Sequence, residues 1–361
     1  MAEVNMEQLL NCALCPNMCR CECPAVQTLG REAVAPAGKA RIAAMLNVGH
    51  LEWNEELLEA VANCLGCRGC TIHCPFPELN LCDELLFTRL EEKGKGVTLP
   101  SWTPYLNNLK KYGSPYGQKP EESLKISNDS KIIFFAGCTS IANHPQSIEA
   151  AKYLFENAGI SYQMIDEDCC GYPAETWGDI DLAKQLASEN RRKMIESGAK
   201  VLVTNCPECW SVFTDRYAAW GFKLPLEIID GPSYFLSLIR SEKLKPEELA
   251  IRKVSYHDPC IWARTAQKTE EPRETLKSIP GLKLEEPFAS KELTRCCGGG
   301  RMFQLAFPKT ANEIAKRRLA EFPAEATIVT ACPFCREGLI QDDRQALELV
   351  ELLAAACGKP K

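Results

Sequence analysis

Cysteine is the residue type whose number and spacing in this sequence could do chemistry. The chain has 361 residues and 21 cysteines, and 18 of the cysteines fall into four clusters. An odd count in a long chain with no export signal argues against a disulfide framework, and clustered thiols in a reducing compartment usually hold metal. The four clusters are Cys12, Cys15, Cys19 and Cys23; Cys64, Cys67, Cys70 and Cys74; Cys138, Cys169, Cys170, Cys206 and Cys209; and Cys260, Cys296, Cys297, Cys332 and Cys335.

The first two clusters have the spacing of ferredoxins. The run that ends at Cys74-Pro75 is C-x2-C-x2-C-x3-C-P, in which three thiolates hold one [4Fe–4S] cubane and the fourth reaches a second cubane. The partner run has one extra residue before Cys19, so Cys21 is an alternative third ligand. The other alternative is structural zinc, which C-x2-C pairs also suit. The predicted ligand sets are Cys12, Cys15, Cys19 and Cys74 for one cubane, and Cys64, Cys67, Cys70 and Cys23 for the other.

The last two clusters repeat a motif of five cysteines, Cys…Cys-Cys-Gly…Cys-x2-Cys. Five thiolates are one more than a cubane has corners. Either one thiolate bridges irons in a distorted cluster, or one stays free as a redox-active thiol. A vicinal disulfide beside a zinc-binding C-x2-C pair is a further alternative. Adjacent cysteines do not easily reach two corners of an ordinary cube, which favours the distorted cluster.

Charge and hydropathy exclude several classes of protein. The chain carries 42 Lys and Arg against 48 Asp and Glu, a net charge of −6, which argues against a nucleic-acid reader with its basic stripe. No run approaches 18 apolar residues, so the sequence predicts no membrane span of its own. The first residues are acidic where a signal peptide is basic, and a cytoplasmic location is expected.

The elements that must position these cysteines change in type along the chain. Residues 1–100 carry helical apolar spacing and are expected to form an α-helical ferredoxin-like domain, and the Pro- and Gly-rich residues 101–130 are expected to be a linker. Short β-rich runs at 131–136, 161–165 and 201–204 then alternate with amphipathic helices, which predicts α/β architecture with parallel strands.

This α/β unit occurs twice. An offset of 126 residues aligns Cys206 with Cys332 and Arg191-Arg192 with Arg317-Arg318, and an offset of 127 aligns the two Cys-Cys-Gly sequences. Two copies of one domain are therefore predicted at residues 131–245 and 246–361. Cysteines that follow parallel strands would meet at the carboxyl edge of each sheet, where ligands gather.

The two repeats carry Cys169-Cys170-Gly171-Tyr172-Pro173 and His257-Asp258-Pro259-Cys260, and they resemble the paired cysteine-rich CCG domains of heterodisulfide reductase. With the ferredoxin-like part and its segment at 36–41, the plan resembles the D-type subunit of that enzyme. Iron–sulfur subunits of glycolate, lactate and anaerobic glycerol-3-phosphate dehydrogenases are similar. The resemblance implies a non-cubane [4Fe–4S] cluster on each complete five-cysteine motif, with a disulfide cleaved between the two clusters.

The predicted function is an iron–sulfur oxidoreductase subunit. Two cubanes receive electrons from a partner, and two non-cubane clusters reduce a disulfide. No flavin or nucleotide motif is found, so the donor is expected to be a flavoprotein, a ferredoxin-like protein or a membrane cytochrome b that could hold the chain at a membrane. His257 is a candidate proton donor to a leaving thiolate, although a His in such a loop also serves to bond the backbone. The alternatives are an electron relay to a quinone or another enzyme without disulfide chemistry, and a zinc scaffold or redox sensor without enzymatic activity.

Overall fold

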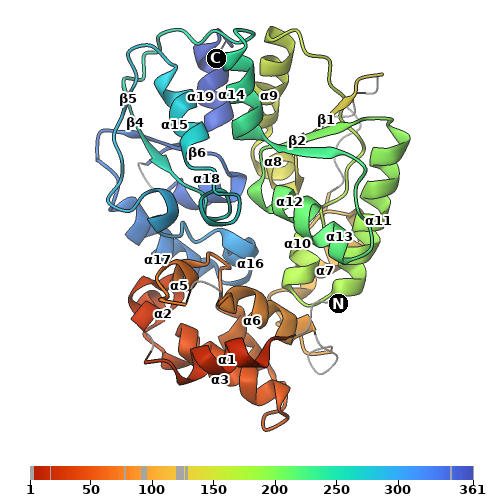
Figure 1. Ribbon diagram of the computed structural model, residues 1–361, viewed down its shortest axis with the longest axis vertical. Coiled ribbons are helices and arrows are strands. Elements are labelled where there is room, and N and C mark those ends of the chain that lie inside the picture. The colour runs from red at the N-terminus through yellow and green to blue at the C-terminus, as the bar shows by residue number, and fades with distance from the viewer. Residues whose placement is uncertain are drawn as a thin grey trace.

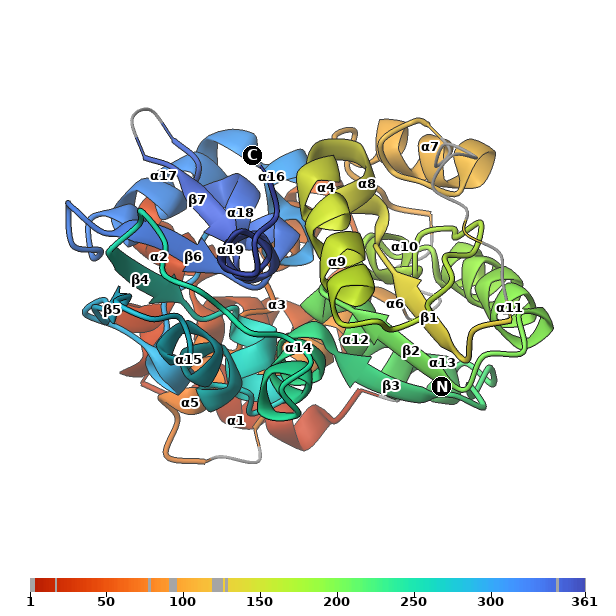
Figure 2. The same ribbon diagram turned by 90° about the horizontal axis from the view of Figure 1, so that it is seen from above.

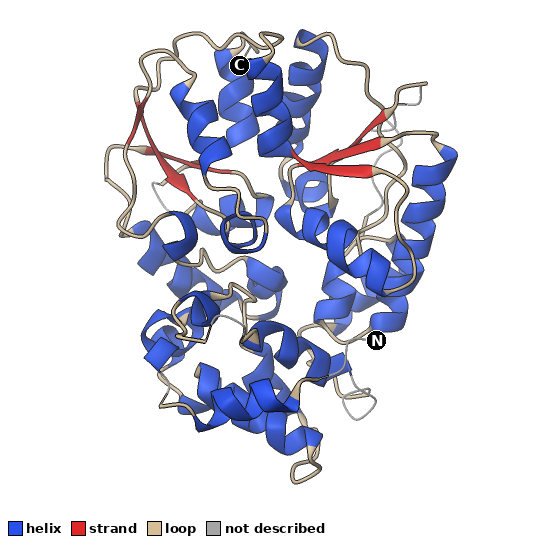
Figure 3. Cartoon of the chain, viewed as in Figure 1, coloured by secondary structure: helices blue, strands red, loops and turns tan. Residues whose placement is uncertain are grey.

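A computed structural model describes residues 4–16, 18–76, 79–90, 96–118, 126, 129–341 and 344–360. The N-terminal helical domain lies at one end of the molecule, and the two α/β halves lie beside each other at the other end (Figure 1). Figure 3 shows one small sheet in each half, with helices between the two sheets. This arrangement agrees with the predicted α-helical domain followed by duplicated α/β domains.

Short helices form the N-terminal domain. Asn5 and Asn54 begin two of them, because their side chains accept hydrogen bonds from the backbone N–H of Gln8 and Leu57. Leu9, Ala40 and Leu85 meet in the small core of this domain. The elements are α1 (Met6–Leu14), η1 (Met18–Glu22), α2 (Pro24–Leu29), η2 (Glu32–Val34), α3 (Pro36–Asn47), α4 (Glu55–Ala62), α5 (Gly69–Ile72) and α6 (Leu81–Leu90).

The segment predicted as a linker at 101–130 contains a helix, α7 (Thr103–Tyr112), so the prediction of a draped loop is wrong for these residues. Leu106 and Leu109 lie on one face of α7 and are buried in the core of the first α/β half. Gly113 ends the helix with φ +67°, a conformation that glycine adopts without strain. Apolar spacing therefore outweighed the proline and glycine content. Residues 119–125, 127 and 128 lie outside the described part of the chain.

The first α/β half contains a parallel sheet in the order β1-β2-β3. Ile133 pairs with Leu202, and Leu202 pairs with Ile228. The predicted strand at 161–165 is wrong as a full strand, since only Gln163 and Met164 form isolated bridges before the chain turns into the cysteine loop. The elements are β1 (Ile132–Phe135), α8 (Cys138–Asn143), α9 (Pro145–Asn157), α10 (Tyr172–Thr176), α11 (Ile180–Glu196), β2 (Val201–Thr204), α12 (Pro207–Ser211), η5 (Val212–Arg216), α13 (Tyr217–Ala219), β3 (Glu227–Asp230) and α14 (Gly231–Arg240).

The second half repeats this topology in the strand order β5-β4-β6-β7, again parallel. Strands β4, β6 and β7 take the places of β1, β2 and β3, and β5 takes the place of the bridge at Gln163. The elements are β4 (Lys253–His257), η6 (Ile261–Thr265), α15 (Glu270–Lys277), β5 (Lys283–Leu284), η7 (Lys291–Leu293), η8 (Gly300–Met302), α16 (Phe303–Ala306), α17 (Pro308–Leu319), β6 (Thr327–Thr330), α18 (Pro333–Leu339), β7 (Ala346–Glu348) and α19 (Leu349–Ala356).

The two halves share a packed boundary. Helix α9 of the first half lies against α19 of the second half (Figure 2). Ser147 Oγ lies 3.0 Å from Glu348 Oε1 and 2.9 Å from Glu351 Oε1 across this boundary, and its single hydroxyl hydrogen is shared between the two carboxylates. Phe135 of the first half and Ile328 of the second belong to one hydrophobic core. Because the core is continuous, the carboxyl edges of the two sheets are held in a fixed relation.

Candidate iron–sulfur centres

The cysteines of the N-terminal domain form two neighbouring groups. Cys12, Cys15, Cys19 and Cys74 line one cavity, with Cys70 at its wall. Burial, followed by charge repulsion from Cys74 and Cys15, raises the pKa of Cys12 to about 11. The last cysteine of the second run therefore lies with the first three cysteines of the first run, and Cys70, which the ferredoxin spacing assigns to the other cubane, lines the same cavity.

Cys23 of the first run packs on the same hydrophobic cluster as Cys67 of the second run. Burial is the largest reason that the pKa of Cys23 is raised, and Cys67 and Cys64 are the thiols whose charge adds to the rise. Cys21 is exposed and donates to the carbonyl of Met18 at 3.4 Å, and it is not among the described residues that line the cavity of Cys19. This geometry favours Cys19 over Cys21 as the thiol of the first group.

Sequence reasoning set Cys82 aside, but the structure brings it into the second group. Cys82 lies in α6 and is buried, and its Sγ is 4.0 Å from the Sγ of Cys64. No local signal indicates this contact, because Cys82 lies in an apolar helical run with none of the short spacing that marks a ligand. The approach of α6 to the loop after α4 is a tertiary contact.

In the first α/β half the five cysteines line one cavity. Cys138 begins α8 directly after β1, and Cys206 is the N-cap of α12 after β2, so both follow strands as predicted. The Sγ atoms of Cys138 and Cys169 are 3.6 Å apart. The side chain of Asn190 donates to the carbonyls of Asp168 and Cys169 and thereby fixes the loop that carries the vicinal pair.

In the second half the five cysteines also line one cavity, here with His257. Cys260 precedes η6 after β4, and Cys332 is the N-cap of α18 after β6. Backbone N–H groups point at the sulfurs: Gly298 N is 3.4 Å from Cys296 Sγ, and Gly299 N is 3.5 Å from Cys297 Sγ. Such donors stabilise thiolates and anionic clusters.

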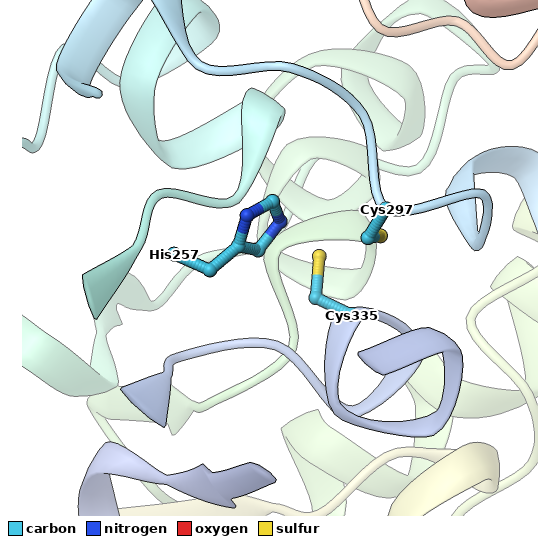
Figure 4. A group of neighbouring side chains, drawn as sticks. All are labelled: His257, Cys297 and Cys335. Carbon is cyan, nitrogen blue, oxygen red and sulfur yellow. The ribbon is translucent and has the colours of Figure 1, made fainter. Parts of the chain in front are cut away.

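His257 lies beside the five cysteines of the second α/β half. One ring nitrogen of His257 and the Sγ atoms of Cys297 and Cys335 all lie within 4.8 Å of one another (Figure 4). Burial is the main cause that lowers the pKa of His257, so the ring is neutral. Arg318 Nε donates to His257 Nδ1 at 3.2 Å. Because Nδ1 accepts this bond, the ring proton is on Nε2.

Glu208 is a residue that sequence reasoning missed. It lines both five-cysteine cavities, and it is the residue that their described walls have in common. Its Oε2 atom is 3.6 Å from Cys206 Sγ of the first half and 3.8 Å from Cys332 Sγ of the second half. Burial raises the pKa of Glu208 to about 8. The sequence shows that Glu208 lies inside the C-x2-C motif of the first half, but it gives no sign of the contact with Cys332 of the second half.

The second five-cysteine group adjoins the N-terminal domain. Cys67 of the N-terminal domain packs against the hydrophobic cluster that contains Cys296, and the interaction with Cys296 is the largest cause that lowers the pKa of Cys67. Arg264 donates to the carbonyl of Cys67, and Arg295 Nε is 3.0 Å from Glu22 Oε2. Among the hydrogen bonds of the described residues, none joins a cysteine of the first half to the N-terminal domain.

Comparisons with known proteins agree with this geometry. A model described as a cysteine-rich domain, CCG, matches residues 132–214 and 254–339, and a 4Fe-4S dicluster domain matches residues 8–77. The D-type subunit of the dihydromethanophenazine:CoB–CoM heterodisulfide reductase of Methanosarcina barkeri is 30% identical over 328 residues, covering 84% of this chain and 80% of the relative. This chain belongs to the family of the heterodisulfide reductase D-type subunit. It is therefore an iron–sulfur oxidoreductase subunit of that type.

Other relatives of this D-type chain have different names. The B-type subunit of the fumarate reductase (CoM/CoB) of Methanothermobacter marburgensis is 29% identical and covers 65% of this chain and 48% of its own. The EtfAB:quinone oxidoreductase of Syntrophomonas wolfei is 27% identical and covers 81% and 44%. Among solved structures, an aspartate racemase homologue from Pyrococcus horikoshii reaches a TM-score of 0.27 at 12% identity, covering 62% of this chain and 96% of its own.

The residues fit the clusters that the family implies. None of the described cysteines forms a disulfide, and the ten cysteines of the two five-cysteine groups line two cavities, the second of which also directs backbone N–H groups at its sulfurs. A set of this kind suits iron and sulfide, whereas it exceeds the four ligands of a zinc ion. No helix in the described part of the chain has the length and apolar character needed to cross a bilayer.

Proposed function

We propose that this chain reduces a disulfide between its two α/β halves, with electrons that a partner protein delivers to the N-terminal domain. The proposed cofactors are two cubane [4Fe–4S] clusters on the eight N-terminal cysteines and one non-cubane [4Fe–4S] cluster on each five-cysteine group. These clusters would supply one-electron transfer. The overall reaction takes two electrons and two protons and converts RSSR′ to RSH and R′SH.

The observation that carries the proposal is the shared wall of the two cavities. Glu208 lies within 4 Å of a cysteine from each half, so the two sulfur groups face each other across one side chain. A disulfide is short, and its cleavage yields two thiolates that each need a place to bind. The two five-cysteine groups, one on each side of Glu208, would provide the two binding sites for these thiolates.

The chain's own residues would serve the reaction in two ways. The cysteines of both groups are buried or half-buried, which excludes bulk water from the reacting sulfurs. His257 presents Nε2–H beside Cys297 and Cys335, where it would donate a hydrogen bond to a departing thiolate and stabilise its charge. Arg318 fixes this tautomer, since its guanidinium can only donate to Nδ1.

The contact between Cys67 and Cys296 supports an order for the electrons. The second α/β half would receive them from the N-terminal domain, and the first half would receive them through the second. The donor would be a flavoprotein, a ferredoxin-like protein or a membrane cytochrome b, and the last would hold the chain at a membrane.

The test is an EPR titration of the anaerobically purified, iron-loaded protein. About sixteen iron and sixteen sulfide per chain are expected for four [4Fe–4S] clusters. With a one-electron oxidant present, addition of a substrate thiol should produce a new paramagnetic signal, because the oxidant would remove one electron from the centre that binds the thiolate and leave an odd electron there. The alcohol with oxygen in place of sulfur is the matched control and should produce no signal.

Two outcomes would contradict the proposal. A protein with about eight iron per chain would lack the clusters of the two α/β halves. A fully loaded protein whose spectrum is the same with and without every thiol tested would favour the relay function, in which electrons pass to a quinone or another enzyme.

A further inference from the structure

A buried arginine of the second α/β half reaches into the N-terminal domain. Arg301 belongs to η8 and is 6% exposed. Its Nη2 atom donates to the Cys82 carbonyl at 3.0 Å. A Cβ added to Gly66 would collide with the Arg301 Nε atom. Because Gly66 lies between Cys64 and Cys67, the guanidinium lies on the loop that carries two proposed cubane ligands.

The backbone of η8 is fixed by this contact between domains. Arg301 and Met302 have φ +55° and +53°, a conformation that costs a residue with a side chain about 1–2 kcal/mol. Gly300 lies so close to the cysteine loop that an added Cβ would collide with the Leu65 carbonyl oxygen. Such strain persists where the surrounding packing determines the backbone. The direction of the Arg301 side chain therefore depends on the packing of the second half on the N-terminal domain.

Two nitrogens of the Arg301 side chain have no acceptor among the described residues. Its Nε and Nη1 atoms are buried without a hydrogen-bond partner. A buried donor without a partner costs about 1–3 kcal/mol, and more when the donor is charged. A buried cation is costly as well unless a negative charge lies nearby. The position of Arg301 therefore indicates that an anion belongs beside it.

The carboxylates around Arg301 do not balance the cations. Asp83 is shared by three guanidinium groups, those of Arg68 at 3.1 Å, Arg216 at 3.3 Å and Arg301 at 3.9 Å. Arg216 also contacts Glu175 at 3.4 Å. Three cations thus face two carboxylates among the described residues, and the contact of Arg301 is the longest. A cubane held by thiolates is an anion and would offset the remaining positive charge.

The thiol of Cys64 is close enough to be affected by this charge. The interaction with Cys82, followed by burial, raises the pKa of Cys64, and the charges of Lys39 and Arg301 oppose the rise. Lys39 lies on α3 and is 2% exposed. Two buried cations, one from the N-terminal domain and one from the second half, therefore favour negative charge at Cys64.

We propose that Arg301 raises the reduction potential of the cubane assigned to Cys23, Cys64, Cys67 and Cys70, because its buried positive charge stabilises the electron that reduction adds. This cubane is called the Cys64 cubane below. The proposal rests on the cubane part of the proposed function and is independent of the disulfide substrate. The reduction takes one electron from the donor protein and no proton, and the same electron passes on to the second α/β half.

The other N-terminal group has a carboxylate nearby. Burial is the main cause that raises the pKa of Cys12, and the charge of Glu84 adds to the rise. Because negative charge disfavours reduction, the cubane assigned to the Cys12 group would have the lower potential of the two. Electrons would then pass from the Cys12 group to the Cys64 cubane and onward to the half that supplies Arg301.

A redox titration of the iron-loaded protein, followed by EPR, tests the proposal. Arg301→Gln removes the charge and keeps most of the side-chain length. The reduction equilibrium of the Cys64 cubane should shift about tenfold toward the oxidised form, which is about 59 mV for one electron. The shift should be the same at low and high salt, because a buried charge is screened little. The signal that Cys15→Ser alters identifies the other cubane, which is the internal control and should shift less.

Three further variants separate charge from structure. Arg301→Lys keeps the charge and should restore most of the potential. Asp83→Asn removes the carboxylate that Arg301 shares and should shift the same equilibrium the opposite way, about threefold toward the reduced form, or about 30 mV. A general loosening of the structure would not cause shifts of opposite sign. Arg240→Gln, on the exposed side of α14, is the charge-matched control and should leave both potentials unchanged.

Iron content and circular dichroism show whether each variant is loaded and folded, and Asp83→Asn alone decides if Arg301→Gln does not load. The proposal is overturned if loaded Arg301→Gln keeps the potential of the unaltered protein, if Arg301→Lys shifts it as far as Arg301→Gln does, or if Asp83→Asn lowers it. These results would leave the proposed function intact. An unaltered protein without the signal of the Cys64 cubane would overturn the proposed function and this proposal together.

Discussion

The two α/β halves share a topology and a five-cysteine motif, but their surroundings differ. The cysteines of the second half adjoin the N-terminal domain, through Cys296 beside Cys67 and through the bond from Arg264 to the Cys67 carbonyl. The first half instead packs its cysteine loop on the segment around α7, where Cys169 N donates to the Gly113 carbonyl at 2.7 Å. One duplicated unit has thus acquired two positions relative to the N-terminal domain.

The means of fixing the vicinal cysteines also differ. In the first half the amide of Asn190 bonds the cysteine loop directly. In the second half Arg318 bonds His257, which in turn faces Cys297. Both halves therefore keep the five cysteines, while the residues that support the cysteines differ with their neighbours.

The largest expected effect comes from removing one vicinal cysteine from each half. Cys297→Ser and Cys170→Ser should each reduce disulfide turnover at least about 100-fold, because both thiolate sites are needed. Cys297→Ser should also slow reduction of the first-half cluster, since electrons would pass through the second half. Cys170→Ser should leave reduction of the second-half cluster fast. Freeze-quench EPR after addition of reductant measures how fast the remaining cluster is reduced in each of the two variants.

Cys357→Ser, at the end of α19, is the control and should retain turnover and all signals. Equal rates of reduction of the remaining cluster in the two vicinal variants would contradict the proposed order of electron transfer.

The next effect concerns the glycine that follows each vicinal pair. Gly298 has φ +91° and an added Cβ would lie 2.5 Å from the Ala311 carbonyl oxygen, whereas Gly171 has φ +96° and the Cβ would lie 3.0 Å from the Ala183 carbonyl oxygen. Gly298→Ala should cost about 3 kcal/mol of unfolding free energy and Gly171→Ala about 2 kcal/mol. Urea unfolding followed by circular dichroism measures the loss of unfolding free energy in both variants. A larger loss for Gly171→Ala than for Gly298→Ala would show that α17 moves away from the added methyl group more easily than α11 does.

Asn190→Ala should destabilise the first half by about 1–2 kcal/mol, because the backbone of Asp168 and Cys169 loses buried hydrogen bonds. Iron should be lost from the first-half cluster before the second. Thermal melting with EPR of the remaining iron checks both results. Loss of second-half iron first would argue against a local role for Asn190.

The smallest effect is expected for Arg264→Gln. Loss of a positive charge beside Cys67 should lower the potential of the nearby cubane by on the order of 30 mV, since 59 mV is a factor of ten for one electron. The half-exposed position of Arg264 allows solvent to screen the charge. Redox titration followed by EPR gives the value. Arg192→Gln, on the exposed face of α11, is the charge-matched control and should cause no shift.

Much of the architecture was readable from local spacing. The runs around Cys12 and Cys64 predicted that Cys74 lies with Cys12, Cys15 and Cys19, and the offset between Cys206 and Cys332 predicted the duplication and the strand-end positions of the cysteines. Local composition was misleading at 101–130, where α7 forms, and at 161–165, where only bridges form.

The amino-acid sequence determined which thiols belong together within each run, because ligand spacing and strand-to-helix turns depend on residues that are close along the chain. Only the tertiary structure decided that Glu208 joins the two halves, that Cys82 approaches Cys64, and that the second half rather than the first meets Cys67. These contacts connect residues that are far apart in sequence and depend on how the three parts of the chain pack on one another, which no local pattern encodes.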